Sequence, residues 1–247
     1  MKIMEDKFSL EGKHVLICGA SGGIGNAIAR LAAKSGATLF LTGRNEEKLK
    51  MLMQSIHGKD HGFFSADLIK SSERQALIEH LPQIDGVVYA AGSTAHMPAS
   101  FINEGHLEQL MKINFESAVL LLSGLLTGKK IVQNGSLVFI SSVASRLPYF
   151  GGAIYSASKA ALESYVKTLA LELAPKKIRS NALSPTFVQT EMVEKTEKII
   201  SSESLEKLRK IHPLGFGTPE DVAHAAVFFL SDASSWITGE NISMGGI

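Results

Sequence analysis

Residues 14–36 read HVLICGASGGIGNAIARLAAKSG, and this stretch decides the fold of the chain. The apolar run HVLIC (14–18) predicts a buried strand, and AIARLAAKSG (27–36) predicts a helix. Three glycines occupy the turn between them: Gly19, Gly23 and Gly25. Glycine allows close approach to the backbone, and the free N–H groups of a helix N-terminus attract phosphate. The turn therefore predicts a phosphate site. The alternative is a glycine-rich turn without a ligand, because the spacing G-x-x-x-G-x-G differs from the commoner G-x-G-x-x-G.

The same alternation of strand and helix continues along the chain. Further strands are predicted at TLFLT (38–42), GFFSA (62–66), GVVYA (86–90), SLVFIS (136–141), IRSNALS (178–184) and NISM (241–244). Helical patterns lie near 24–35, 45–56, 71–80, 104–127, 155–173 and 219–231. Several strands are apolar at successive positions, which is typical of strands covered on both faces. The sequence therefore predicts an α/β fold, a single doubly wound, Rossmann-like parallel sheet with helices on both faces. Ligands bind such sheets beyond the carboxyl ends of the strands.

Composition fits one globular domain and excludes several other classes. The 247 residues are 45% hydrophobic and carry a net charge of +1, so no electrostatic footprint for nucleic acid or an anionic membrane is present. Cys18 is the only cysteine, which excludes internal disulfides, and we expect no metal site. The N-terminus lacks the apolar core of a signal peptide. The longest apolar run, AVLLLSGLL (118–126), is far shorter than the ~20 residues of a membrane span, so we expect a cytoplasmic protein.

A tyrosine and a lysine lie four residues apart in YSASK (155–159), inside a predicted helix. Positions i and i+4 share a helix face, so the Lys159 ammonium can lie near the Tyr155 phenol. A nearby positive charge lowers the pKa of a phenol from its usual value of about 10. We therefore expect Tyr155 to serve as a general acid for a carbonyl oxygen. A lone pair of this kind is usually an ordinary surface pair, and the glycine turn is what favours the chemical interpretation.

Together these motifs resemble those of the short-chain dehydrogenase/reductase family in its single-domain form. The resemblance covers nearly the whole chain, and its motifs are CGASGGIG (18–25), SADL (65–68), AAG (90–92), KIN within MKINF (111–115), ISS (140–142), YSASK (155–159), NALSPTFVQT (181–190) and TGENISMGG (238–246). Within the family the chain looks most like 3-oxoacyl-acyl-carrier-protein reductases. The resemblance implies one NAD(P)-binding Rossmann domain over 1–247 that reduces a ketone or oxidises a secondary alcohol by hydride transfer. A 3-oxoacyl thioester is one substrate class that it implies.

The resemblance also assigns roles to individual residues. Tyr155 would be the general acid, and Lys159 would hold the nicotinamide ribose and lower the pKa of the tyrosine. Ser142 would donate a hydrogen bond to the substrate oxygen, where charge develops. Asn114 would support a water that feeds protons to the site, and Asn181 would be structural. Taken alone, Ser142 could be a capping residue and Asn114 an ordinary exposed amide.

The cofactor-binding residues that the resemblance implies are Gly19, Ser21, Gly22, Gly23, Ile24, Gly25, Arg44, Asp67, Leu68, Ala91, Gly92, Tyr155, Lys159, Pro185, Val188 and Thr190. Asp67 could instead be a turn residue, and Thr190 a helix cap.

Gly43 stands where NAD enzymes of this shape usually place an acid after the second strand, and Arg44 follows it. An arginine there can pair with a 2′-phosphate through its planar fork. The sequence therefore predicts NADP(H) as the preferred cofactor, with NAD(H) as the alternative. Arg44 could instead be a solvated cation near Glu46 and Glu47.

Substrate and assembly are less determined by the sequence. The substrate lid is expected at about 191–213, and Met97, Phe150 and Met192 are candidate pocket residues by position. An acyl-carrier partner would require basic residues near the entrance, and Lys129, Lys130, Lys176 and Lys177 are available for this. Relatives commonly assemble through the helices at 104–127 and 155–173, so we expect a homotetramer. A non-catalytic NADP(H)-binding sensor or scaffold is the alternative function. A methyltransferase on a similar sheet is disfavoured by YSASK.

Overall fold

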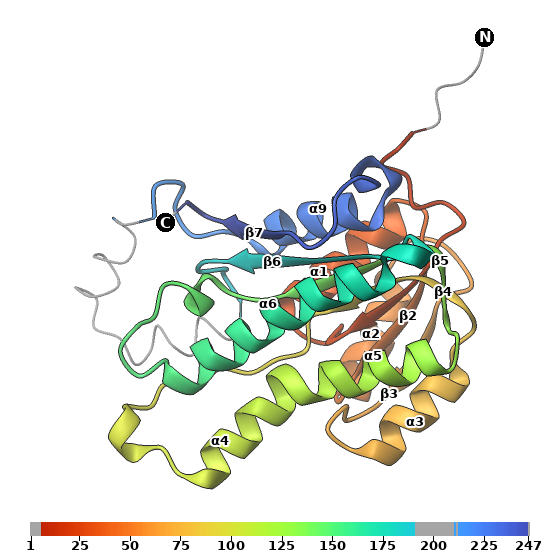
Figure 1. Cartoon of the computed structure of the whole chain (residues 1–247). Coiled ribbons are helices and arrows are strands. Elements are labelled where there is room, and N and C mark those ends of the chain that lie inside the picture. Colours follow the sequence, from red (N-terminus) through yellow and green to blue (C-terminus); the bar gives the residue numbers. More distant parts are fainter. Residues whose placement is uncertain (1–5, 191–209, 211, 247) are drawn as a thin grey trace.

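Seven parallel strands form one sheet in the order β3-β2-β1-β4-β5-β6-β7 (Figure 1). The structure is a computed structural model that describes residues 6–190, 210 and 212–246. The strands are β1 (His14–Cys18), β2 (Thr38–Gly43), β3 (Gly62–Ser65), β4 (Ile84–Tyr89), β5 (Ile131–Ile140), β6 (Arg179–Pro185) and β7 (Asn241–Met244). The predicted fold class, a doubly wound parallel sheet, is confirmed.

Helices cover both faces of the sheet, so that Figure 1 shows α5 and α6 in front of it and α1 and α9 behind. The helices are α1 (Gly23–Lys34), α2 (Glu46–Ser55), α3 (Ser71–His80), α4 (Glu104–Met111), α5 (Ser117–Thr127), α6 (Ala153–Leu173) and α9 (Pro219–Leu230). Short helical turns are η1 (Ala99–Phe101), η2 (Lys112–Glu116), η3 (Val143–Ser145), η4 (Ala174–Lys176) and η5 (Asp232–Ser234). Alternate residues of β1 enter opposite layers, because Val15 and Ile17 pack with α1, α2 and α9, whereas Leu16 and Cys18 pack with α3, α5 and α6.

Three element boundaries differ from the sequence prediction. The helix expected over 104–127 contains a π-helical segment, η2, between α4 and α5. The helix expected from residue 155 begins at Ala153, which places Tyr155 in its first turn. The strand expected at 136–141 begins at Ile131 instead, because the register shifts between the pairs Ile84–Ile131 and Gly86–Ser136. Asn134 has φ +65° within this shift, and the polar QNG sequence there resembles a turn.

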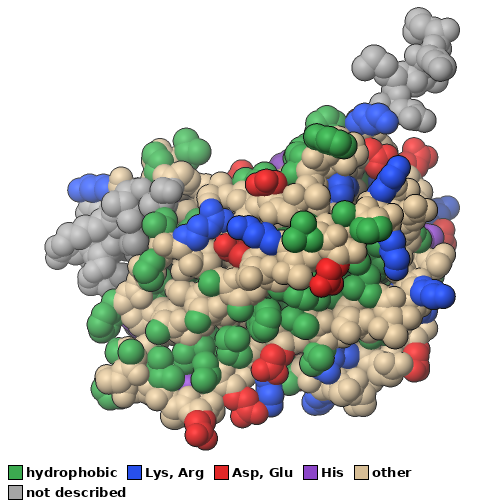
Figure 2. All heavy atoms as spheres, in the orientation of Figure 1, with side chains coloured by type: hydrophobic (Ala, Val, Ile, Leu, Met, Phe, Trp, Pro, Cys, Tyr) green, Lys and Arg blue, Asp and Glu red, His purple; other side chains and the backbone are tan. Residues whose placement is uncertain are grey.

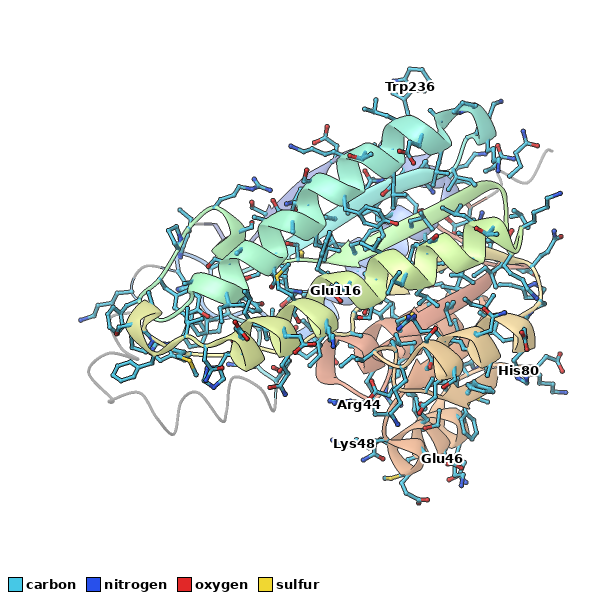
Figure 3. All side chains as sticks on the ribbon, turned by 60° about the horizontal axis from the view of Figure 1, so that its bottom comes forward. Arg44, Glu46, Lys48, His80, Glu116 and Trp236 are labelled. Atoms are coloured by element: carbon cyan, nitrogen blue, oxygen red, sulfur yellow. The ribbon has the colours of Figure 1, made fainter. Side chains whose placement is uncertain are left out.

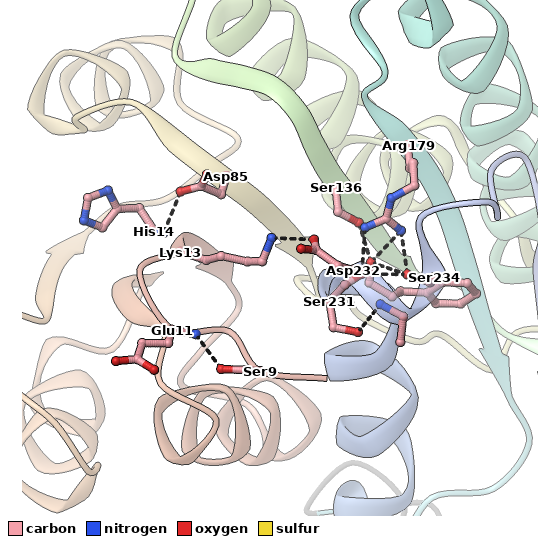
Figure 4. A network of polar contacts seen from close by, with 12 residues as sticks. Ser9, Glu11, Lys13, His14, Asp85, Ser136, Arg179, Ser231, Asp232 and Ser234 are labelled. Atoms are coloured by element: carbon pink, nitrogen blue, oxygen red, sulfur yellow. Dashed lines mark hydrogen bonds and ion pairs between the residues drawn. The ribbon is translucent and has the colours of Figure 1, made fainter. Parts of the chain in front are cut away.

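Polar side chains tie the C-terminal part of the chain to the sheet (Figure 4). Arg179 of β6 is buried and donates hydrogen bonds to the Phe229 carbonyl at 2.8 Å and the Ser234 hydroxyl at 2.7 Å. The neighbouring Ser136 of β5 donates to the same Phe229 carbonyl at 2.7 Å. Asn181 donates to the Ile237 carbonyl at 2.9 Å, which confirms the structural role expected of it. These contacts hold the end of α9 against β5 and β6.

The continuous helical stretch Glu104–Thr127 is long and apolar enough to cross a membrane by length and composition. One side of it nevertheless packs inward, and Leu121, Leu122 and Leu125 are fully buried in the layer shared with β4 and β5. Its centre also carries the buried amide of Asn114. We interpret the stretch as a core helix of the α/β fold.

Shortening a core side chain on α2 tests this packing. Leu52 is 1% exposed, whereas the adjacent Met51 is 68% exposed. We expect Leu52→Ala to lower the free energy of unfolding by about 2–5 kcal/mol, because it removes buried methyl groups and leaves a cavity. The matched control Met51→Ala should change it by less than about 0.5 kcal/mol. Urea denaturation of both variants measures the difference, and equal effects would contradict the burial assigned to α2.

Candidate active site

The residues predicted to act in catalysis converge beyond the carboxyl ends of β4 and β5. Ser142 follows β5 and caps η3, Asn114 lies in η2, and Tyr155 and Lys159 lie on successive turns of α6. The Ser142 hydroxyl lies close enough to the Tyr155 phenol to lower its pKa. The Lys159 Nζ atom lies 5.8 Å from the centroid of the Tyr155 ring. Residues far apart in the chain thus place a hydroxyl, a phenol and an ammonium in one neighbourhood.

Lys159 is buried despite its charge. Its side chain is 5% exposed, and Nζ donates a hydrogen bond to the Ile140 carbonyl at 2.9 Å. Burial lowers the pKa of Lys159 to about 8, and the negative charge of Glu163 opposes that decrease. The ammonium is therefore held at the end of β5 by the sheet backbone.

The pKa of Tyr155 differs from the sequence prediction. Burial raises the pKa of this phenol above its usual value, and the nearby Ser142 hydroxyl only partly opposes the increase. The expected net decrease in the Tyr155 pKa does not appear in this structure, because burial of the phenol dominates and the Lys159 ammonium donates to the Ile140 carbonyl. Tyr155 is consequently neutral at neutral pH and carries the proton that a general acid requires.

Asn114 connects three parts of the site. The residue is 0% exposed, and its Oδ1 accepts a hydrogen bond from the Ser93 amide at 2.8 Å. Its Nδ2 donates to the Ser93 carbonyl at 3.0 Å and to the Ser158 hydroxyl at 3.0 Å. Ser158 in turn donates to the Tyr155 carbonyl at 2.7 Å. The amide therefore fixes the segment after β4 to α6, whereas its proposed support of a water remains a prediction. π-Helical segments such as η2 often occur at functional sites.

The glycine turn packs too closely for side chains. Gly19 has φ +81°, and a Cβ atom there would lie 2.7 Å from the Ala91 amide nitrogen. A Cβ at Gly25 would lie 2.2 Å from the Gly19 carbonyl oxygen, and one at Gly23 would lie 2.9 Å from Thr190 Cγ2. The turn thus meets both the AAG segment after β4 and the end of the segment after β6. Such a cradle fits the predicted dinucleotide.

The start of α1 is free of side-chain capping. Its N-cap is Gly22, which offers no side-chain acceptor to the first-turn N–H groups. Ser21 precedes it, and Ile24 and Gly25 follow in the first turn. The first-turn amides and the positive end of the helix dipole can therefore face an anionic ligand.

The end of β2 carries glycine where NAD enzymes usually place an acid. A Cβ at Gly43 would lie 2.8 Å from the Ser21 hydroxyl oxygen. The next residue, Arg44, is exposed, and within the described residues its side chain forms no ion pair. Glu46 pairs with Lys50 at 2.8 Å, so the exposed Arg44 also agrees with the alternative of a solvated cation, and contact with a 2′-phosphate remains a prediction. Arg44 and Lys48 project from the start of α2 in Figure 3.

The remaining predicted cofactor residues occupy the same edge of the sheet. A Cβ at Gly92 would lie 3.2 Å from Asn114 Oδ1 and 3.5 Å from Lys159 Nζ. Asp67 Oδ1 accepts a hydrogen bond from the Ile69 amide at 3.2 Å, so it has the turn role of the alternative interpretation, and adenine contact remains a prediction. Leu68, Pro185 and Val188 are buried.

Two predictions on the substrate side have different outcomes. Residues 191–209 and 211 lie outside the described residues, and with them most of the lid and Met192. The four lysines considered for an acyl carrier do not lie near the entrance, which corrects that expectation. Lys129 and Lys130 precede β5, and Lys176 and Lys177 precede β6, so all four lie at the amino ends of strands. The site lies at the opposite, carboxyl ends.

Three side chains near the site were not predicted from the sequence: Tyr149, His96 and Glu163. Tyr149 lies close enough to Tyr155 to raise the pKa of its phenol, and its ring stacks with His96 at 6.1 Å between centroids. The Met97 amide donates to the Gly151 carbonyl at 2.7 Å, so the segments bearing His96 and Tyr149 are joined by backbone as well. The third is Glu163, whose signal in the sequence is its position four residues after Lys159.

Comparison with known proteins supports an enzyme of this kind. Residues 19–246 match the family described as enoyl-(acyl carrier protein) reductase. The 3-oxoacyl-[acyl-carrier-protein] reductase FabG of Rickettsia felis is 38% identical over 240 residues, covering 96% of this chain and 97% of that protein. The NAD-dependent glycerol dehydrogenase of Listeria innocua is 31% identical, with 99% and 97% covered. A solved short-chain dehydrogenase/reductase from Brucella melitensis, described as glucose/ribitol dehydrogenase, is 29% identical with a TM-score of 0.89, and 98% of each chain is covered.

Burial of the Lys159 ammonium predicts a pH-dependent stability difference. The folded chain releases this proton near pH 8, whereas the unfolded chain retains it to about pH 10.5, so stability attributable to Lys159 rises between these values. The stability of Lys159→Met relative to the unsubstituted chain should therefore fall by up to about 3 kcal/mol from pH 7 to pH 10.5. Urea unfolding across this range measures it. The exposed Lys167→Met is the control, and a pH-independent difference for Lys159→Met would refute the burial.

Proposed function

The chain belongs to the short-chain dehydrogenase/reductase family and is an NAD(P)-dependent enzyme for C=O or CH–OH groups, and from this premise we propose a specific reaction. The proposal is an NADP(H)-dependent oxidoreductase that reduces a ketone, or oxidises a secondary alcohol, with Tyr155 as general acid or base. The observation that carries it is the gathering of the Ser142 hydroxyl, the Tyr155 phenol and the buried Lys159 ammonium, whose Nζ atom lies 5.8 Å from the centroid of the Tyr155 ring.

The chemistry of the protein follows from these groups. A bound reduced nicotinamide supplies the hydride. Ser142 donates a hydrogen bond to the substrate carbonyl oxygen, and Tyr155 transfers its phenolic proton to that oxygen as negative charge develops. Lys159 stabilises the phenolate that remains, because its ammonium lies over the ring rather than in solvent. In alcohol oxidation the same groups act in reverse, with the phenolate accepting the proton.

The cofactor preference is proposed from the end of β2. Glycine at position 43 supports it, since this residue supplies no carboxylate for a ribose 2′-hydroxyl, and a larger side chain there would require the Ser21 hydroxyl to move. The exposed guanidinium of Arg44 can meet a 2′-phosphate. The relative from Listeria innocua is named an NAD-dependent enzyme, so the proposal depends on these local features rather than on overall similarity. NAD(H) is the alternative.

For the substrate we propose a small-molecule carbonyl or alcohol, with a 3-oxoacyl thioester on an acyl carrier as the first class to test. The similarity to the reductase of Rickettsia felis supports this class. Within the described residues, the basic side chains considered for carrier recognition lie at the wrong edge of the sheet. A carrier would therefore contact other residues near the site.

A cytoplasmic homotetramer is the proposed form of the enzyme. Leu107 of α4, Leu120 of α5 and Leu171 of α6 are exposed on the helical layer in front of the sheet. Figure 2 shows apolar side chains gathered on this face. Exposed apolar patches of this kind often mark contacts between proteins. Light scattering after size-exclusion chromatography tests the assembly, and a monomer at micromolar concentration would contradict it.

Removing the phenolic hydroxyl separates the enzyme from a binding protein. Tyr155→Phe should lower kcat for ketone reduction by about 10²–10⁴-fold, because the general acid is lost. NADPH affinity, measured by fluorescence, should change by less than about 2-fold, since binding energy resides largely in the dinucleotide cradle. Tyr165→Phe, on the same helix, is the control. Tight NADPH binding without turnover of any ketone by the unsubstituted chain would favour a non-catalytic sensor or scaffold.

Reversing the charge after β2 tests the cofactor proposal. Arg44→Asp should lower the ratio of kcat/KM with NADPH to kcat/KM with NADH by about 10–100-fold, because charge-assisted hydrogen bonds to a 2′-phosphate are lost. Arg30→Asp alters net charge equally from the exposed surface of α1 and serves as control. An unchanged ratio in Arg44→Asp would remove Arg44 from cofactor selection.

A further inference from the structure

Glu163 gathers hydrogen bonds from three separate elements beside the site. Its Oε1 atom accepts from the Ser141 hydroxyl at 2.9 Å and from the Ser184 hydroxyl at 2.9 Å. The Ser145 hydroxyl donates to the same oxygen at 2.5 Å. These serines belong to the turn after β5, to the end of β6 and to η3, respectively. One carboxylate thus joins α6 to two neighbouring strand ends.

The environment keeps this carboxylate ionised. Its side chain is 12% exposed, and the Arg146 Nε atom lies 3.4 Å from Oε2. Burial alone would raise the pKa of Glu163, but the hydrogen bonds from Ser145, Ser141 and Ser184 outweigh burial and leave the pKa below its usual value. The charged groups that face it are Arg146 from the end of η3 and Lys159 from its own helix.

The bonds of Glu163 act on the segment that carries Ser142. Ser141 precedes Ser142 directly, and Ser145 lies three residues beyond it. The Ser145 hydroxyl also lies 2.8 Å from the Ser142 carbonyl oxygen, and the Ser142 hydroxyl accepts from the Ala144 amide at 3.2 Å. The turn is therefore fixed on both sides of Ser142 to the helix that presents Tyr155 and Lys159.

We propose that Glu163 is a positioning residue for the proposed reaction, holding the Ser142 turn against α6 so that the Ser142 hydroxyl lies beside the Tyr155 phenol. The inference rests on the proposed function for its kinetic consequence only. Glu163 touches neither Tyr155 nor Ser142 directly and acts through Ser141, Ser145 and the next turn of α6. We infer no such role for exposed residues elsewhere on the same helix, such as Glu172.

Substitution at position 163 tests the inference kinetically. Glu163→Ala should lower kcat by about 10–100-fold, because a misplacement of roughly 1 Å in a catalytic group has an effect of this size. NADPH affinity should stay within about 2-fold. Glu163→Gln keeps an acceptor oxygen without the charge, so it should recover part of kcat. The alkaline limb of its profile of kcat against pH should move to lower pH, because Lys159 loses the negative charge of Glu163, which favours the protonated lysine. Glu172→Gln is the matched control and should match the unsubstituted chain in every measurement.

A second measurement is independent of turnover. Hydrogen exchange at the amides of residues 143–147 should become faster in Glu163→Ala, whereas exchange in β1 and α1 should not change. If the unsubstituted chain reduces no ketone but this local effect appears, the proposed function fails and the positioning role stands. Unchanged kcat, pH profile and local exchange in Glu163→Ala would overturn the inference. If that variant does not fold, Ser145→Ala decides instead, since it removes one of the three hydroxyls and should show smaller changes in the same direction.

Discussion

The burial of a protonated lysine at the end of β5 is the constraint on which the rest of the site depends. A charge removed from water is costly unless polar groups replace the lost hydration. Here the Ile140 carbonyl accepts a hydrogen bond from Lys159, and the Glu163 carboxylate supplies opposite charge one turn farther along α6. Both partners are fixed, one by the sheet and the other by three serine hydroxyls. The ammonium is therefore held by the fold before any ligand arrives.

Tyr155, Lys159 and Glu163 lie four positions apart on α6, so they share one face of the helix. Each of them contacts a different part of the site. Tyr155 meets Ser142, Lys159 meets the end of β5, and Glu163 meets the serines around β5 and β6. The face that carries the proposed proton donor is thus the same face that fixes the helix to the sheet. A displacement of α6 that would separate Tyr155 from Ser142 would also break the bonds of Glu163. This arrangement resists such a displacement through contacts of the helix with two strand ends and η3.

The elements and the approximate site followed from the sequence, because they depend on local patterns. Apolar runs, the glycine turn and the YSASK spacing each act within a few residues. The pKa direction of Tyr155 did not follow, since it depends on burial and on the Lys159 ammonium donating to a carbonyl nineteen residues away in the chain. The role of Glu163 was missed for a similar reason. Its partners are serines, whose spacing in the sequence gives no sign that they meet at one oxygen. The lysines at 129, 130, 176 and 177 were misplaced because composition does not reveal which edge of the sheet a residue occupies.

Cofactor binding and proton transfer are supported here by different kinds of contact. The glycine turn is held by backbone packed on backbone, with Gly19 against Ala91 and Gly25 against Gly19, so only the absence of side chains is required. The proton-donating side is held by directed hydrogen bonds among Asn114, Ser93 and Ser158, which need particular polar atoms. The two systems meet at Gly92, where an added Cβ would crowd both Asn114 and Lys159. A methyl group at this position would therefore disturb both systems at once. Changes deeper within either system should therefore affect cofactor binding or proton transfer separately.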